Sequence, residues 1–139
     1  MNLCYLRKSG GRRKRGGVAA AEFAVCLPVI VLLVLAMIES CTMIFLKQSC
    51  SIAAYEGART ALLENAAADD IRRTSQLVLT ERRVKGGTVT ISPRNFESLP
   101  IGAYIEVTVS APADLNSVIP GNFFRGKLLS ATATMMKEL

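Results

Sequence analysis

The hydrophobic pattern divides the chain into two regions. Residues 18–46 are mostly apolar and carry only two charged side chains, Glu22 and Glu39, whereas beyond residue 47 polar and apolar positions alternate. The uncharged stretch 23–38 alone would measure about 24 Å as an α-helix. Its flanks extend it to the ~30 Å of a bilayer's hydrocarbon core. The pattern therefore predicts a transmembrane helix over residues 18–46.

Pro28 lies inside this apolar helix, between Phe23 at one end of the uncharged stretch and Ile38 at the other. A proline removes one backbone hydrogen bond and presses on the carbonyl four residues earlier, here that of Ala24. We therefore predict a kink or local loosening at this point. Membrane helices tolerate such a site when a neighbouring helix or water satisfies the freed carbonyl.

The region from residue 47 begins as helix, because Ile52, Tyr55 and Leu62 keep helical spacing. A break is expected over residues 65–70. Asp69 or Asp70 can cap a second helix running to about Val84, with Gly86-Gly87 as its stop.

Three stretches then alternate between apolar and polar residues, as strands with one buried face do. They cover residues 88–92, 104–109 and 129–135. The predicted fold class is α+β: a long N-terminal transmembrane helix continues into a helical segment that packs on a small three-stranded antiparallel sheet. In the loop before the last strand, Phe123-Phe124 is either core-facing, which we favour, or a contact patch.

The charge distribution argues against a nucleic-acid partner. The formal net charge is +6, and all six excess charges lie in the leader, at Arg7, Lys8, Arg12, Arg13, Lys14 and Arg15. No basic face with interleaved aromatic residues remains for phosphate binding. Lys/Arg-rich flanks stay cytoplasmic. We therefore divide the chain into a basic cytoplasmic leader (1–17), a transmembrane helix (18–46) and an extracytoplasmic α+β domain (47–139).

No pattern in the chain indicates catalysis. Histidine is absent, and neither metal-ligand spacing, a phosphate-cradling glycine loop nor an S-x-x-K pair occurs. We expect no enzyme, no cofactor and no metal. No cysteine follows Cys50, so disulfides do not hold the outer domain. Cys26, Cys41 and Cys50 are expected to face lipid or a neighbouring helix, with an intermolecular bond through Cys50 as the alternative.

The junction of leader and apolar helix is the most informative part of the sequence. Glu22 stands at the entrance of the membrane segment, five residues after Gly17. A cut after Gly17 would place a new α-ammonium on Val18, on the same helix face as Glu22. A carboxylate in a low-dielectric setting needs a cation, and the ammonium of an adjacent subunit would supply one and fix the register between helices. The alternative is a carboxylate that snorkels to the interface without a role.

Two further interpretations of the junction were weighed. A cleaved signal peptide competes, but the small residues 19–21 stand before the apolar run instead of after it. Glu39 falls about 32 Å along the helix from Val18, at the outer interface. A solvated carboxylate is favoured there, with a salt bridge to a partner helix as the alternative.

The stretches Gly17-Val18-Ala19-Ala20-Ala21-Glu22-Phe23-Ala24-Val25 through Pro28, then Ile38-Glu39, then residues 53–61, resemble the TadE-like pseudopilins of tight-adherence (Flp-type) pilus systems. The resemblance implies that a prepilin peptidase cuts after Gly17 and that Glu22-Phe23 is the glutamate–aromatic pair following such cuts. It also implies a minor pilin-like subunit that assists assembly of a bacterial adhesion pilus. The pattern does not separate TadE from its relative TadF.

The implied partners are the prepilin peptidase, other pilin-like subunits associating through the N-terminal helix, and the tight-adherence secretion machinery. The implied location is the bacterial inner membrane, as a single-pass protein with a cytoplasmic N-terminus and an extracytoplasmic domain, with incorporation into a surface pilus open. The competing hypothesis is an uncleaved, membrane-tethered module whose sheet binds an extracellular ligand; Glu22 would then be incidental.

Overall fold

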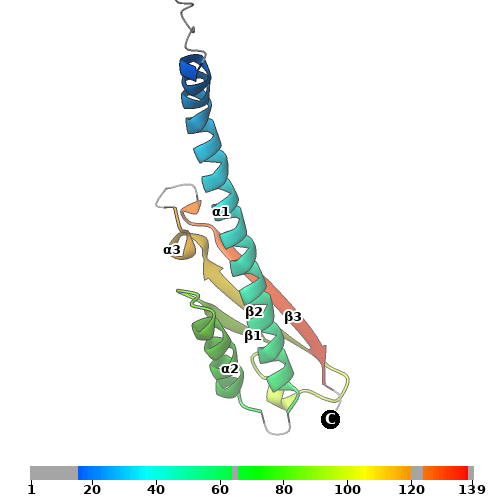
Figure 1. Cartoon of the computed structure of the whole chain (residues 1–139). Helices are drawn as coiled ribbons and strands as arrows, with labels where there is room; N and C mark the ends of the chain where they lie inside the picture. Colours follow the sequence, from blue (N-terminus) through cyan, green and yellow to red (C-terminus); the bar gives the residue numbers. More distant parts are fainter. Residues whose placement is uncertain (1–15, 64–65, 120–123, 138–139) are drawn as a thin grey trace, which may run out of the picture. The chain divides into compact units, whose positions relative to one another are not determined.

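The computed structural model describes residues 16–63, 66–119 and 124–137 (Figure 1). Leader residues 1–15 and Phe123, on which predictions were made, lie outside these ranges. The described residues form helices α1 (Gly16–Ala61), α2 (Ala68–Glu81) and α3 (Ala113–Asn116), a 3₁₀ turn η1 (Phe96–Ser98), and strands β1 (Thr88–Ser92), β2 (Tyr104–Pro112) and β3 (Leu128–Met136). The predicted α+β class is confirmed.

The chain falls into two compact units, one ending at Val34 and the other beginning at Leu35. The first unit contains the N-terminal part of α1. The second contains the rest of α1 and every other helix and strand. Each unit is described below by itself.

The sheet is antiparallel with strand order β1-β2-β3, so β2 is central. Ile91, Val107 and Ala133 are paired across the three strands and point to the same face. Along β2 the buried side chains are Ile105, Val107, Val109 and Ala111, and the residues between them are more exposed. The predicted alternation of one apolar and one polar face is therefore confirmed.

Helix α1 packs on the sheet through a face of small side chains. Ala53, Ala54 and Ala58 have no exposed surface, and they belong to the same core cluster as Val107 of β2. The approach is closest at Gly57, where an added Cβ would lie 2.2 Å from Ser75 Oγ of α2 and 3.2 Å from Val107 Cγ1. Figure 1 shows α1 and α2 over the sheet. Small residues are needed here because larger ones would hold the helices and the sheet apart.

One side chain of α1 reaches the edge of the sheet. The Lys47 ammonium donates a hydrogen bond to the main-chain carbonyl of Ser130 in β3. Because β3 is an outer strand, this bond uses a backbone acceptor at an edge where unpaired groups are otherwise exposed.

Helix α2 begins and ends differently from the prediction. Its N-cap is Ala67, whose methyl group cannot accept a hydrogen bond, and the Asp70 carboxylate instead accepts the Ala67 N–H at 3.2 Å. The helix stops at Glu81 rather than near Val84, since Arg83 adopts φ 58°. The Val84 N–H then bonds back to the Leu79 carbonyl at 2.9 Å, in a Schellman-type end. The backbone thus turns before Gly86-Gly87, the predicted stop.

Cys50 lies in the core and is not available for an intermolecular bond. It has no exposed surface, and its thiol lies 3.9 Å from the Leu129 carbonyl of β3. The alternative of a disulfide through Cys50 is therefore wrong. Burial raises the pKa of the Cys50 thiol above its ordinary value of 9.0, and the nearby Lys47 ammonium lowers it by a smaller amount.

The raised pKa of Cys50 predicts a pH dependence. Above about pH 9 the thiol of the unfolded chain loses its proton before the folded one does, so the unfolded state binds fewer protons and stability falls as pH rises. We expect the thermal midpoint of the full chain in detergent to fall more steeply between pH 8 and 10 than that of Cys50→Ala. If the thermal midpoints of the two proteins fall equally with pH, the Cys50 thiol does not contribute to the pH dependence. The lysines and tyrosines, which also titrate at high pH, are the same in both proteins.

Candidate functional site

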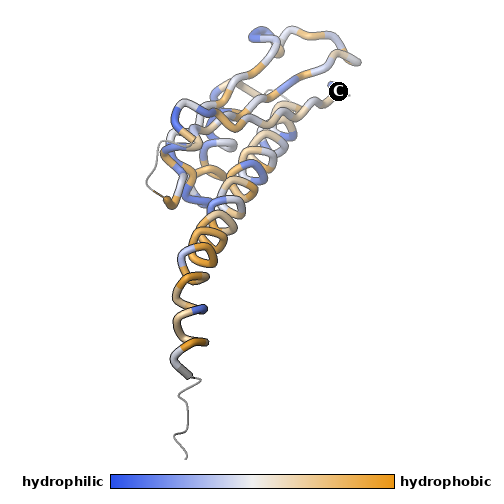
Figure 2. Tube along the Cα trace, turned by 90° about the horizontal axis from the view of Figure 1, so that it is seen from above, coloured by the Kyte–Doolittle hydropathy of each residue, from blue (hydrophilic) through white to orange (hydrophobic). Residues whose placement is uncertain are grey.

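The N-terminal part of α1 is exposed on all sides in the structure. Every residue from Val18 to Ile38 is exposed, and Figure 2 shows mostly apolar colouring along this stretch. Among the described residues, α1 is the one helix long and apolar enough to cross a membrane. These 21 residues would measure about 31 Å, the thickness of a bilayer's hydrocarbon core.

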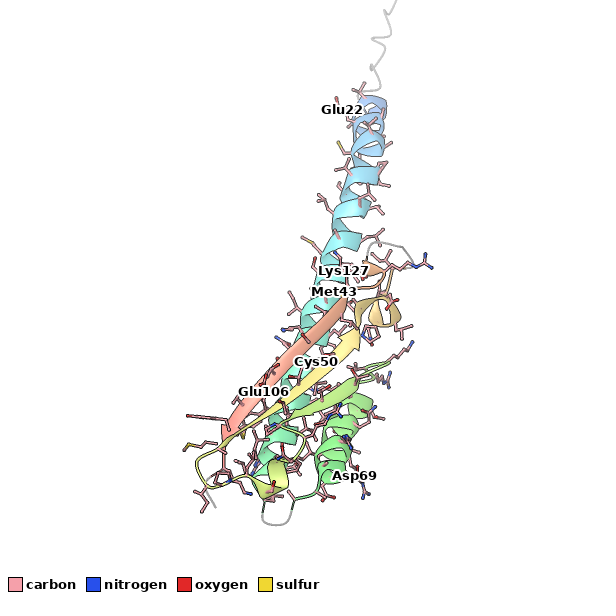
Figure 3. The ribbon with its side chains drawn as sticks, turned by 180° about the vertical axis from the view of Figure 1, so that it is seen from behind. Glu22, Met43, Cys50, Asp69, Glu106 and Lys127 are labelled. Atoms are coloured by element: carbon pink, nitrogen blue, oxygen red, sulfur yellow. The ribbon has the colours of Figure 1, made fainter. Side chains whose placement is uncertain are left out.

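The predicted processing site lies at the beginning of α1. Gly17 and Val18 are both exposed, and a Cβ added at Gly17 would meet no atom within 4 Å. Among the described residues, no side chain therefore approaches the Gly17 side of this peptide bond. Glu22 (Figure 3) and Phe23 follow one turn later and are also exposed. The helix continues through Pro28, where the kink stays a prediction.

Glu22 has no hydrogen-bond or ion-pair partner within the described part of the chain, and its neighbours on α1 are Val18 and Cys26 at helical spacing. A charged carboxylate among apolar side chains is unfavourable in lipid unless a cation reaches it. The structure is consistent with a carboxylate whose partner comes from elsewhere.

Glu39 differs from the predicted solvated carboxylate. It is only 6% exposed, and its carboxylate accepts hydrogen bonds from the Ser117 hydroxyl and from the Ile119 main-chain N–H, the latter at 3.2 Å. Both donors come from the segment after α3. The carboxylate thus attaches the helix to its own outer domain, and neither the solvated form nor the salt bridge to a partner helix describes it.

The burial of Glu39 follows from its position on α1. Residues 39, 46 and 53 lie seven apart, so they share a helix face, and all three are buried. Glu39 is therefore the first residue of the face that packs on the outer domain. The seven-residue spacing that places Glu39 on the buried face can be read from the sequence, because it continues through the small residues downstream. The prediction of a solvated Glu39 relied instead on its distance from the membrane centre.

The stretch 53–61, part of the family resemblance, is a packing motif. Its small residues form the buried face described above, while Tyr55 is 54% exposed and points away from it. Arg59 and Glu56 form an i,i+3 ion pair, with 4.0 Å between nitrogen and oxygen. Such exposed pairs contribute little to stability. The motif thus fixes how α1 meets the sheet and has no chemistry of its own.

Comparison with known proteins agrees with the resemblance. A family model described as TadE-like protein matches residues 17–59, which is α1 almost from end to end. The match covers the glycine junction, the apolar helix and most of the small-residue motif, on which the resemblance was recognised. No curated protein matches the chain, and no solved structure does.

Proposed function

We propose that this chain, a TadE-like protein over residues 17–59, is a minor pilin-like subunit that a prepilin peptidase shortens and that helps to assemble a tight-adherence adhesion pilus. TadE-like proteins are structural proteins associated with this pilus, and the family is not known for enzymes. The finer role assigned here is supported by three features of the N-terminal region.

The first feature is the cleavage site. A basic leader precedes Gly17, and the bond from Gly17 to Val18 is exposed at the beginning of α1. Removal of residues 1–17 by the peptidase would leave a mature chain that begins with the apolar helix.

The second feature is the membrane segment. Val18 to Ile38 is exposed, apolar and long enough to span a bilayer. Glu39 is the first residue of the α1 face that is buried against the outer domain. We therefore place the span at 18–38 in the inner membrane, eight residues shorter at its outer end than the pattern alone suggested. The leader would be cytoplasmic and the α+β domain extracytoplasmic.

The third feature, which carries the proposal, is Glu22. It is a carboxylate without a partner in the described chain, four residues from the amino terminus that cleavage would create. In an assembly, the α-ammonium of Val18 from a neighbouring subunit would neutralise it. A charge pair in a low-dielectric setting fixes register because a shifted helix leaves both charges unpaired. The other pilin-like subunits and the secretion machinery are the partners that this role requires.

Cleavage is tested by the intact mass of the chain isolated from its own cells. We expect residues 1–17 to be absent, with Val18 at the amino terminus. The same chain from cells lacking the prepilin peptidase should keep Met1, which controls for trimming by other proteases. Retention of the leader in cells with an active peptidase would instead favour an uncleaved, tethered binding module.

A further inference from the structure

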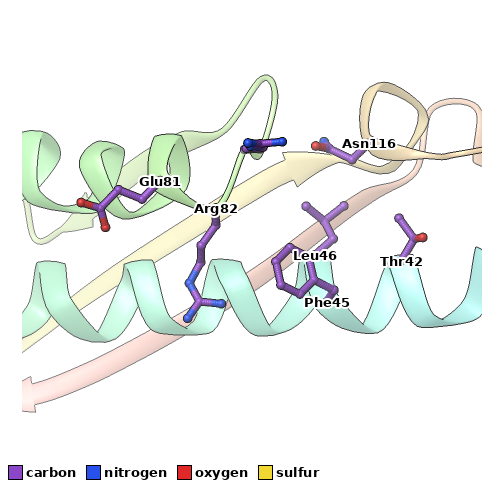
Figure 4. A pocket seen from close by; sticks show the side chains of 7 residues that line it. Thr42, Phe45, Leu46, Glu81, Arg82 and Asn116 are labelled. Atoms are coloured by element: carbon purple, nitrogen blue, oxygen red, sulfur yellow. The ribbon is translucent and has the colours of Figure 1, made fainter.

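A pocket of about 470 Å³ opens between α1, the C-terminal end of α2 and α3 (Figure 4). Phe45 and Leu46 of α1 form its apolar floor. Arg82 and Arg83 from the end of α2 supply its positive charge. Thr42, Glu81 and Asn116 complete the lining. The pocket thus combines an apolar base with a cationic rim.

The pocket lies where α1 would leave the membrane. Measured along α1 from Ile38, Thr42 is about 6 Å and Phe45 about 10 Å further on. The polar headgroup region extends roughly 5–8 Å beyond the hydrocarbon core on each side. With the span placed at residues 18–38, Thr42 therefore lies within the headgroup layer and Phe45 lies just outside it.

The two arginines of this pocket form no ion pair among the described residues. The Arg82 guanidinium lies 6.0 Å from the centroid of the Phe45 ring, and Figure 4 shows it extended over α1. Arg83 takes part in neither of the ion pairs found among the described residues, which are Arg59–Glu56 and Arg72–Asp69. Glu81, which also lines the pocket, offsets one of the two charges.

The loop beside the pocket is fixed by Asn116. Its side-chain amide donates to the Lys85 carbonyl at 3.0 Å, and its side-chain oxygen accepts the Lys85 N–H at 2.9 Å. These two bonds join α3 to the segment after α2, so Lys85 adds a third exposed cation close to the same opening. The main chain at Lys85, next to the two arginines, is therefore fixed by hydrogen bonds to α3.

We propose that this pocket binds the headgroups of anionic phospholipids in the outer leaflet of the membrane that α1 crosses. The inference rests on the membrane placement given under the proposed function and on nothing else in it. The two arginines suit the phosphates at the outer edge of the headgroup layer, next to which the pocket opens.

The test uses the full chain in nanodiscs of phosphatidylcholine alone or of equal parts phosphatidylcholine and phosphatidylglycerol. For the natural sequence, we expect a thermal midpoint at least ~5 °C higher in the anionic discs, because a ligand that binds only the folded state raises the midpoint. The double variant Arg82→Gln/Arg83→Gln should lose most of this difference. Because the thermal midpoints in the two kinds of disc are compared for the same variant, a change in that variant's intrinsic stability does not affect the difference.

The matched control is Arg72→Gln/Arg73→Gln. These arginines line a second pocket on the same helix, ten residues and about 15 Å away. This control should keep the full difference. Both variants keep the basic leader, so any attraction of the leader to anionic lipid is the same in the two. An equal loss in both variants, or no difference in the natural sequence, would overturn the proposal. Failure of the chain to enter the discs would instead refute the membrane placement, and so the proposed function.

Discussion

Replacing Gly57 by valine is expected to lower the free energy of unfolding by about 3 kcal/mol, because the new side chain overpacks a full interior. Its Cβ alone would lie 2.2 Å from Ser75 Oγ and 3.2 Å from Val107 Cγ1. For a domain of this size, the thermal midpoint of the full chain in detergent should fall by more than about 10 °C. Ser51→Val is the control, because Ser51 lies on the exposed face of the same helix and should change stability by only tenths of a kcal/mol.

A rescue experiment identifies the clash. The Ser75 hydroxyl is buried and makes no hydrogen bond within the described residues, so removing it sacrifices none. We expect Ser75→Ala to recover part of the stability lost in Gly57→Ala, the smaller substitution. Strict additivity of the two changes would show that Ser75 is not what excludes a side chain at Gly57.

The second large effect separates the two glutamates of α1. Glu39→Ala removes the acceptor of the Ser117 hydroxyl and the Ile119 N–H, and should lower the free energy of unfolding by roughly 2–3 kcal/mol. Proteolysis of the segment 117–119 should accelerate, since its attachment to α1 is lost. Glu22→Ala should leave the thermal midpoint of the isolated chain unchanged.

For assembly, the substitution with the larger expected effect is Glu22→Ala and not Glu39→Ala. We expect Glu22→Ala to reduce association between tagged copies, measured by co-purification from cells with an active peptidase, by tenfold or more, because the α-ammonium of Val18 loses its carboxylate. Glu22→Gln keeps the shape without the charge and should fail in the same way. If Glu22→Ala associates normally after correct cleavage, the register role is wrong. If Glu39→Ala is as stable as the natural chain, the buried attachment is unimportant.

The sheet could be predicted from the sequence because its signal is local. Alternation along residues 88–92, 104–109 and 129–135 requires only that one face be buried, and the strands formed within a few residues of those limits. The neighbour of the small-residue face of α1 could not be predicted from the sequence. A run of alanines and glycine fits lipid, a partner helix or a sheet equally well, and only the fold shows that the sheet is its neighbour.

The misses at Glu39 and Cys50 share a physical cause, which is contact between residues far apart in the sequence. Glu39 is hydrogen-bonded to Ser117 and Ile119, nearly 80 positions away. No local sequence pattern predicts these contacts. The end of α2 depends on Arg83 adopting a left-handed conformation, which propensity assigns to the glycines that follow. Cys50 similarly became a core residue through β3.

The lysine that α1 extends to β3 bears on how copies of this protein can join. Polymers that grow by strand donation need an outer strand with its backbone acceptors free to receive a newcomer. Ser130 has already given its carbonyl to Lys47, so this border is closed to a foreign strand at that point. In the proposed assembly, this occupied acceptor would favour growth through contacts between the membrane helices over pairing at the sheet edge.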